Sequence, residues 1–346
     1  MRYTDHATRI VLFLGLAAFP CLAQPPLPAG AAAGQSGALS EALSWLPENT
    51  EAVMGASGVF ALTDPNTSTD SQPRPYLEEL TLRVQTLPLA MLLFKNGGLA
   101  DLIYSKPVML AIEGSRRFRA PARLGPMRYE GCEIVLFGDA VTLDWTAFRR
   151  KAARSAVRFE DVEGTDVAVF QQSIDHDQWT TLVAFPRNNI LLLATDRNYL
   201  QTVLKRMRTP SSARALPETL QEWNYVDTRA TVWGLRHYRS EKAGMDPTSP
   251  FQEKVAANVP DNDAVGATFW FEPERQTVVA AYISLNPSAD RIVARHLRPD
   301  LPAATGIRVV ELAPAIVQAT AGLSDLDHFY NLMFGVMALM GHAVYM

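Results

Sequence analysis

The chain has 346 residues, a formal net charge of -4 and a hydrophobic share of 48%, a composition typical of a folded globular protein. A mildly acidic total gives no general attraction to nucleic acid or to an anionic surface, so we expect no nucleic-acid partner. At roughly 150 residues per domain, the length favours two domains.

The N-terminus has the order of parts found in a secretory signal peptide. Arg2 and Arg9 flank a charged opening, and a continuous apolar run follows over residues 10–18. This run is shorter than the roughly 20 residues that span a bilayer, so cleavage after Ala23 is favoured over a retained anchor. Cys21 leaves lipoprotein processing as an alternative. We therefore expect an exported protein, periplasmic or extracellular, that has lost residues 1–23.

Residues 24–37 are mostly proline, alanine, glycine and glutamine, which offer too little apolar surface for folding and predict a flexible leader. A helix over residues 38–45 and a strand over residues 51–60 are predicted next. The helical spacing of residues 76–94 is interrupted by a proline, which indicates two short helices or one kinked helix. Residues 107–112 again have strand character.

Cys132 would be the only cysteine left after cleavage, so no internal disulfide is predicted. The neighbouring Glu130 and Glu133 would raise the pKa of its thiol. We therefore interpret Cys132 as a structural residue at the start of a strand over 133–137, rather than as a reactive nucleophile. A helix with one apolar face is predicted from Asp144.

The clearest local pattern consists of three strands and a helix in succession. The strands are predicted over residues 167–170, 178–185 and 190–194, and their short connections indicate antiparallel neighbours. Thr195 or Asp196 then caps a helix whose apolar residues recur at helical spacing. This pattern predicts a meander that ends in an amphipathic helix.

A linker-like composition over residues 209–216 predicts a boundary between two α+β parts, residues 38–210 and residues 217–346. In the second part, strands over 265–271 and 277–285 form a predicted hairpin. The fold class expected is α+β, with antiparallel meander sheets and packed amphipathic helices.

A short sequence similarity links the two predicted parts. Residues 46–49 (Leu-Pro-Glu-Asn) precede one predicted strand, and residues 259–262 (Val-Pro-Asp-Asn) precede another. Two related halves are one interpretation, and a chance likeness is the other. A strand opener of this kind, followed by strands and a strand-to-helix ending, resembles a group of uncharacterised secreted bacterial proteins known only as a domain of unknown function. The resemblance implies no activity, and no functional residue is carried over from it.

The usual catalytic motifs are missing from the sequence, which has no Gly-x-Ser-x-Gly, Walker-type loop, His-Glu-x-x-His or Cys-x-x-Cys. No catalytic residue, metal ligand or cofactor is therefore predicted. Asp175, His176 and Asp177 could bind a metal or supply a base, but the triplet lies in a predicted hairpin connection, and a solvated turn is favoured. A hydrolase with a dispersed site is the alternative, and a cleft in which His176, His237 or His296 meets carboxylates would favour it.

Arginines cluster ahead of the Cys132 strand and again on the helix that begins near Asp144. If both groups faced one way, they could bind a phosphate-bearing or acidic polymer. The other interpretation is a solvated helix face and an exposed loop. The candidate anion-binding residues are Arg116, Arg117, Arg119, Arg149, Arg150 and Arg154.

Residues 329–346 carry no charged side chain and reach the length of about 18 residues at which a membrane helix becomes a candidate. Asn331 and His342 interrupt this run, so a buried core or dimer-contact helix is favoured, and membrane contact through 329–346 is left open. The function expected is a non-catalytic binding or structural role at the cell envelope. The partner is expected to be an unidentified envelope component or a second copy of the chain.

Overall fold

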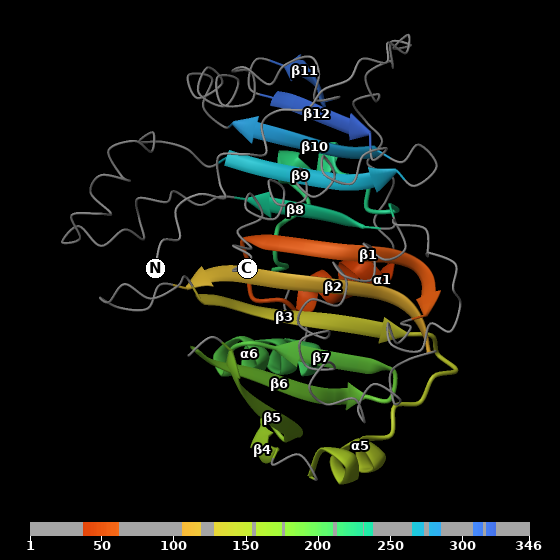
Figure 1. The fold of residues 1–346 in the computed structure, drawn as a ribbon, viewed down its shortest axis with the longest axis vertical. Coiled ribbons are helices and arrows are strands. Elements are labelled where there is room, and N and C mark those ends of the chain that lie inside the picture. Colours follow the sequence, from red (N-terminus) through yellow and green to blue (C-terminus); the bar gives the residue numbers. More distant parts are fainter. Residues whose placement is uncertain are drawn as a thin grey trace, which may run out of the picture.

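The structure is a computed structural model (Figure 1). It describes residues 37–61, 106–118, 128–153, 157–174, 177–209, 213–230, 232–237, 265–272, 277–284, 307–313 and 316–322. The sequence-based predictions for residues 1–36, 76–94 and 329–346 fall outside these ranges.

Twelve described strands form one antiparallel sheet, which confirms the α+β class with antiparallel strands. Their order across the sheet is β11-β12-β10-β9-β8-β1-β2-β3-β7-β6-β5-β4. The strands of the first part are β1 (Ala52–Ala61), β2 (Pro107–Phe118), β3 (Arg128–Phe137), β4 (Arg158–Val162), β5 (Thr165–Ile174), β6 (Asp177–Arg187) and β7 (Ile190–Ala194). Those of the second part are β8 (Trp233–His237), β9 (Val265–Glu272), β10 (Thr277–Ser284), β11 (Ile307–Ala313) and β12 (Ile316–Gly322).

The described helical elements are α1 (Gly37–Trp45), α5 (Trp145–Ala152), α6 (Arg197–Arg208) and the 3-10 helix η2 (Gln221–Tyr225). The helices predicted over 38–45, from Asp144 and after Asp196 are all present. Asp144 and Asp196 each cap a helix by accepting a hydrogen bond from a backbone N–H, at Ala147 and Tyr199 respectively.

The two parts of the chain meet edge to edge, because β1 pairs with β8 and Val53 lies opposite Leu235. Outward from this pairing, the described strands follow the same plan on both sides. Three strands come in sequence order (β1-β2-β3 and β8-β9-β10), and the remaining strands follow in reverse order (β7-β6-β5-β4 and β12-β11). This shared plan agrees with two related halves, which remain a prediction.

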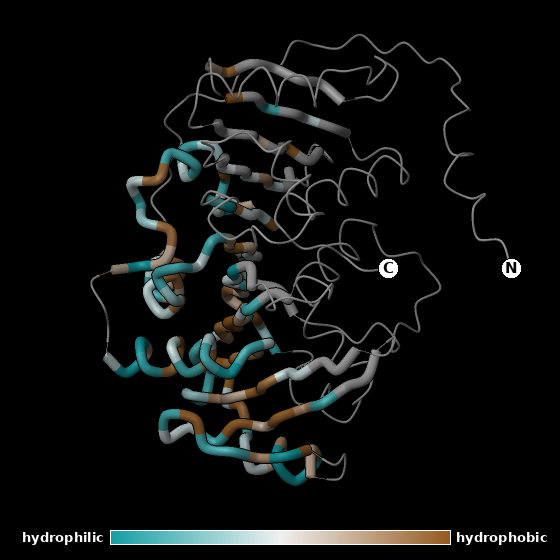
Figure 2. The backbone as a smooth tube through the Cα atoms, turned by 90° about the vertical axis from the view of Figure 1, so that its left-hand side faces the viewer, coloured by the Kyte–Doolittle hydropathy of each residue, from teal (hydrophilic) through white to brown (hydrophobic). Residues whose placement is uncertain are grey.

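Side chains alternate between the two faces of the sheet. Face A carries Cys132 and Ile134 of β3, and face B carries Glu133 and Val135. The helices α1 and α6 and the element η2 pack on face A. Figure 2 shows hydrophobic residues concentrated along the strands and hydrophilic ones on the outer sides of the helices beside them. At the β4–β7 end of face B, α5 packs through Phe148.

A buried arginine ties α6 to α1 and to the segment that follows α6. Arg206 donates hydrogen bonds to the carbonyl oxygens of Ser44, at 2.8 Å, and Ala213, and it also contacts the Glu48 carboxylate at 3.2 Å. A buried cation is stable only where such acceptors surround it, so Arg206 serves the packing of face A.

The β1–β8 pairing depends on a glycine on face A. A Cβ atom added at Gly55 would overlap the indole ring of Trp233, which lies directly across on β8. Because neither the strand backbone nor this fully buried ring can move freely, Gly55→Ala is expected to lower the free energy of unfolding by about 1–3 kcal/mol. Urea denaturation measures this change.

Gly138→Ala is the matched control, since a Cβ there would make only ordinary contact with Pro107. Its effect is expected to stay within about 0.5 kcal/mol. Equal losses for the two variants would contradict the steric role of Gly55.

Candidate functional site

Two carboxyl side chains lie side by side on face B, near the middle of the sheet. Glu113 of β2 is directly opposite Glu133 of β3, and Met54 of β1 is directly opposite Glu113. Residues directly opposite in an antiparallel pair have Cβ atoms about 4.5–5.5 Å apart. The register therefore brings together two carboxyl side chains that are 20 positions apart in the sequence.

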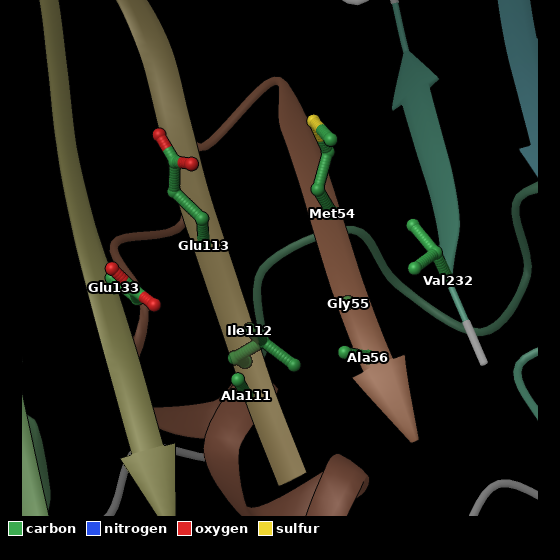
Figure 3. Close-up of a pocket in the computed structure, with 8 residues that line it drawn as sticks. All are labelled: Met54, Gly55, Ala56, Ala111, Ile112, Glu113, Glu133 and Val232. Atoms are coloured by element: carbon green, nitrogen blue, oxygen red, sulfur yellow. The ribbon is translucent and has the colours of Figure 1, made fainter. Parts of the chain in front are cut away.

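These side chains line a small cavity with a volume of about 20 Å³ (Figure 3). A cavity of this size has room for about one water molecule. None of the residues that line it carries a positive charge, and the two carboxyl groups are its ionisable members. The lining residues are Met54, Gly55, Ala56, Ala111, Ile112, Glu113, Glu133 and Val232.

Glu133 is the more deeply buried member of the pair, with 3% of its surface exposed. Its Oε2 atom has no hydrogen-bond partner among the described residues. Burial raises the pKa of Glu133 well above its ordinary value, and the nearby charge of Glu113 raises it further. Both effects favour the neutral form of the Glu133 side chain.

On face B, the neighbour of the pair on the β7 side is apolar, and a basic residue lies farther away on the β8 side. Leu193 of β7 lies opposite Glu133, and Gly234 of β8 lies opposite Met54. Arg236 is two residues beyond Gly234 on the same face and is buried, with its own interactions. The pair is thus set in a low-dielectric region, where charge is costly unless it is neutralised.

A second buried carboxyl group contacts a histidine on face A. Glu222 of η2 is fully buried, and its Oε1 lies 2.6 Å from Nδ1 of His237 at the end of β8. Gly266 makes this possible, because a Cβ there would overlap the Glu222 side chain. The contact fixes the orientation of the half-buried imidazole.

The His237–Glu222 contact is the kind that would favour a hydrolase. In the described parts of the chain, however, no group of three or more His, Cys, Asp or Glu side chains is placed to hold a metal ion. His296 falls outside the described residues. The contact was not predicted, since neither η2 nor β8 was recognised from local sequence.

Two of the candidate arginines, Arg116 and Arg149, lie on opposite faces of the sheet. Arg116 lies on face A, where it pairs with Glu130 and its guanidinium stacks over the Tyr199 ring. Arg149 of α5 lies at the face-B end, pairs with Asp166 and stacks over Phe159. The remaining candidates are Arg117 on β2, Arg150 on α5, and Arg119 and Arg154, which are outside the described ranges.

Cys132 is a buried residue of β3, as predicted. Burial raises the pKa of its thiol, and the charges of Glu133 and Glu113 raise it further, so the thiol is unreactive in the folded protein. Ile174 of β5 pairs with Asp177 of β6, which confirms a hairpin there, but the connection is only two residues long and Asp177 belongs to β6 rather than to the turn. Asp175 and His176, which form that connection, lie outside the described residues.

Among the described helices, none combines the length and the hydrophobicity that crossing a membrane requires. No protein-family model and no curated protein matches the chain. Structures of TP0453 in three crystal forms are similar at a low level. Form I has a TM-score of 0.41 at 9% identity and covers 85% of this chain and 96% of TP0453. Form IV has a TM-score of 0.38 at 8% identity and covers 83% of this chain and 95% of TP0453. Form III has a TM-score of 0.36 at 10% identity and covers 82% of this chain and 95% of TP0453.

Proposed function

We propose that this is an exported cell-envelope protein with a non-catalytic binding or structural role. The observation that carries the non-catalytic part of the proposal is the size of the cavity at the Glu113–Glu133 pair. Sites for small-molecule substrates enclose roughly 300–1,000 Å³, whereas this cavity has about 20 Å³. A space of this size does not enclose an organic substrate between the two carboxyl groups.

Two other sets of buried polar groups support the same proposal, because they are engaged in packing. Thr50 donates to the Pro47 carbonyl at 2.6 Å, so the Tyr199 hydroxyl donates to the Thr50 oxygen at 2.7 Å. Arg206 is held by acceptors from α1 and its surroundings. Groups held in this way stabilise the fold and are not free to exchange protons with a substrate.

Export is the first expectation of this proposal. The mature protein, recovered from the envelope or secreted fraction, is expected to lack residues 1–23, because the N-terminus has the parts of a signal peptide. Intact-mass measurement checks the cleavage. A chain that begins at Met1 would overturn it. Salt extraction without detergent is the expected behaviour, whereas a requirement for detergent would support the alternative of membrane association through residues 329–346.

A hydrolase is the second candidate, and the His237–Glu222 contact favours it. Purified mature protein can be assayed against ester, phosphoester, glycoside and peptide substrates, with His237→Gln as the comparison. The proposed binding role expects no turnover by either protein. Turnover that is lost in His237→Gln without loss of folding would replace the proposal by the hydrolase.

A further inference from the structure

We propose that the cavity between β1, β2 and β3 binds the terminal ammonium group of a small primary amine, which Glu113 and Glu133 hold by accepting its hydrogen bonds. Such a ligand gives the binding role proposed above its chemical class, and the assignment rests on that role. Three features of the site carry it. They are an unpartnered buried carboxyl oxygen, the apolar walls beside the two carboxyl groups, and the burial of the sheet face around them.

Glu133 has a carboxyl oxygen without a partner. Its Oε2 atom is buried and has no hydrogen-bond partner within the described chain, and its side chain lines the cavity (Figure 3). Buried polar atoms are nearly always satisfied by protein, water or a ligand. An ionised carboxyl group only accepts hydrogen bonds, so the group that fits beside Oε2 is a donor.

Glu113 supplies the other acceptors. It lies directly opposite Glu133 and lines the same cavity, but it is only partly buried, so a ligand can approach the pair past its side chain. An ammonium group has three N–H donors and no acceptor. Oε2 of Glu133 and the two oxygens of Glu113 offer three acceptors, which is enough for an ammonium group. A bare metal ion such as Ca²⁺ takes six to eight oxygen ligands, more than this lining offers.

The rest of the lining is apolar and suits the carbon atoms of an amine. Ala56 of β1 lies directly opposite Ala111 of β2, and these two small side chains leave a depression on face B beside the carboxyl pair. Met54 and Val232 border the same space (Figure 3). About 20 Å³ holds an ammonium group and little more, so only the first methylene group of the ligand contacts these walls. Carbon atoms gain from leaving water for such walls.

An ammonium group would take the place of a proton at the pair. Burial favours the neutral form of Glu133, in which a proton supplies the positive charge. Leu193, opposite Glu133 on β7, supplies none. Arg236 on β8 lies opposite Ala52, has interactions of its own and does not line the cavity. Amine binding is therefore expected to release up to one proton, so that amine and proton compete.

The surroundings of the pair favour a free amine over a lysine side chain of a protein partner. A stable protein interface covers about 800 Å² on each partner. On face B, however, the neighbours of the pair are themselves buried, as Ala52, Val135 and Leu193 show. The described residues around the pair thus offer no exposed area on which a protein could pack, whereas a slender amine needs only the approach past Glu113.

The test uses the full mature chain in ethylammonium chloride or tetramethylammonium chloride at one ionic strength, from pH 6 to pH 8. Ethylammonium is expected to raise the melting temperature, whereas tetramethylammonium, which has no N–H donor, is expected to leave it unchanged. Titration calorimetry with ethylammonium is expected to give an affinity that weakens by up to roughly tenfold for each pH unit of acidification, because proton and amine compete. Saturation-transfer nuclear magnetic resonance of ethylammonium gives a second readout on the unmodified protein.

Glu133→Gln is expected to abolish the response to ethylammonium, and Glu113→Gln to weaken it. Glu41→Gln is the matched control, because Glu41 is 53% exposed and pairs with Arg187 at the surface. It removes the same charge and is expected to keep the response. Equal melting temperatures of the wild type in the two salts, or a response that survives in Glu133→Gln, would overturn the site. Export and the absence of turnover are measured separately, so this failure is distinct from a failure of the proposed function.

A lipid headgroup can present the same ammonium group, and vesicles separate this source from a free amine. The proposal expects the protein to bind ethylammonium and not to sediment with vesicles of phosphatidylethanolamine and phosphatidylcholine. Sedimentation with these vesicles but not with pure phosphatidylcholine, together with no binding of ethylammonium, would overturn the assignment to a free amine.

Discussion

Replacement of Trp233 by alanine is expected to lower the free energy of unfolding by about 3–5 kcal/mol, the usual cost of truncating a fully buried aromatic side chain. Trp233 has no exposed surface, and its ring fills the space above Gly55. The centroids of the Trp233 and Trp223 rings are 6.2 Å apart. Truncation would leave a cavity on face A where β1, β8 and η2 meet. Urea denaturation followed by circular dichroism measures the loss.

Met109→Ala is the control for this change, because Met109 is 47% exposed and its truncation is expected to cost no more than about 0.5 kcal/mol. The strands whose amide hydrogens exchange faster in Trp233→Ala are equally informative. Since β8 lies between β1 and β9, amide hydrogen exchange should accelerate in β2 and β3 as well as in β9 and β10. Acceleration confined to β9 and β10 would show that the two parts of the chain unfold independently.

The elements that could be predicted from the sequence are those whose signals are local. The β5–β7 meander has short connections, and α6 follows it with a capping Asp196 and a run of apolar residues at helical spacing. Each of these elements is specified within a few residues by turn chemistry and periodicity. For β2 and β3, the apolar half was predicted, over residues 107–112 and 133–137, but the other half was not, because the sequence there is polar.

Four strands were missed for a different reason. β8 is only five residues long and contains Gly234 and Arg236, and its partners are 182 and 33 residues away at Val53 and Thr268. β12 is rich in small and polar residues, and its strand character comes from pairing with β10 and β11. β4 and β11 were not recognised either. Such strands are stabilised by non-local pairing rather than by local propensity.

The candidate site shows the same limit. From the sequence, Glu133 had a predicted role only as a neighbour of Cys132, and no role was predicted for Glu113. Their meeting depends on the β2–β3 register, which the sequence alone did not supply. The placement of two candidate arginines has the same origin, since the register and the packing of α5 put Arg116 and Arg149 on opposite faces.

The pH dependence of stability is expected to change when Glu133 is replaced by glutamine. The pKa of Glu133 in the folded protein is raised above its ordinary value of 4.5. Below pH 4.5 the side chain is protonated in both the folded and the unfolded protein. As the pH rises above 4.5, the unfolded chain releases this proton while the folded protein retains it, so the free energy of unfolding falls until the folded pKa is passed.

Glu133 is therefore expected to lower the wild-type free energy of unfolding by up to about 1.4 kcal/mol for each pH unit in this window. Glu133→Gln keeps the shape of the side chain but cannot ionise, so it should lack this contribution and be the more stable protein at pH 8. Urea denaturation of both proteins between pH 4 and pH 8 measures the difference. If the free energies of unfolding of the two proteins stay parallel over this pH range, the pKa of Glu133 is not raised by folding. A neighbouring group, rather than a proton, would then neutralise its charge.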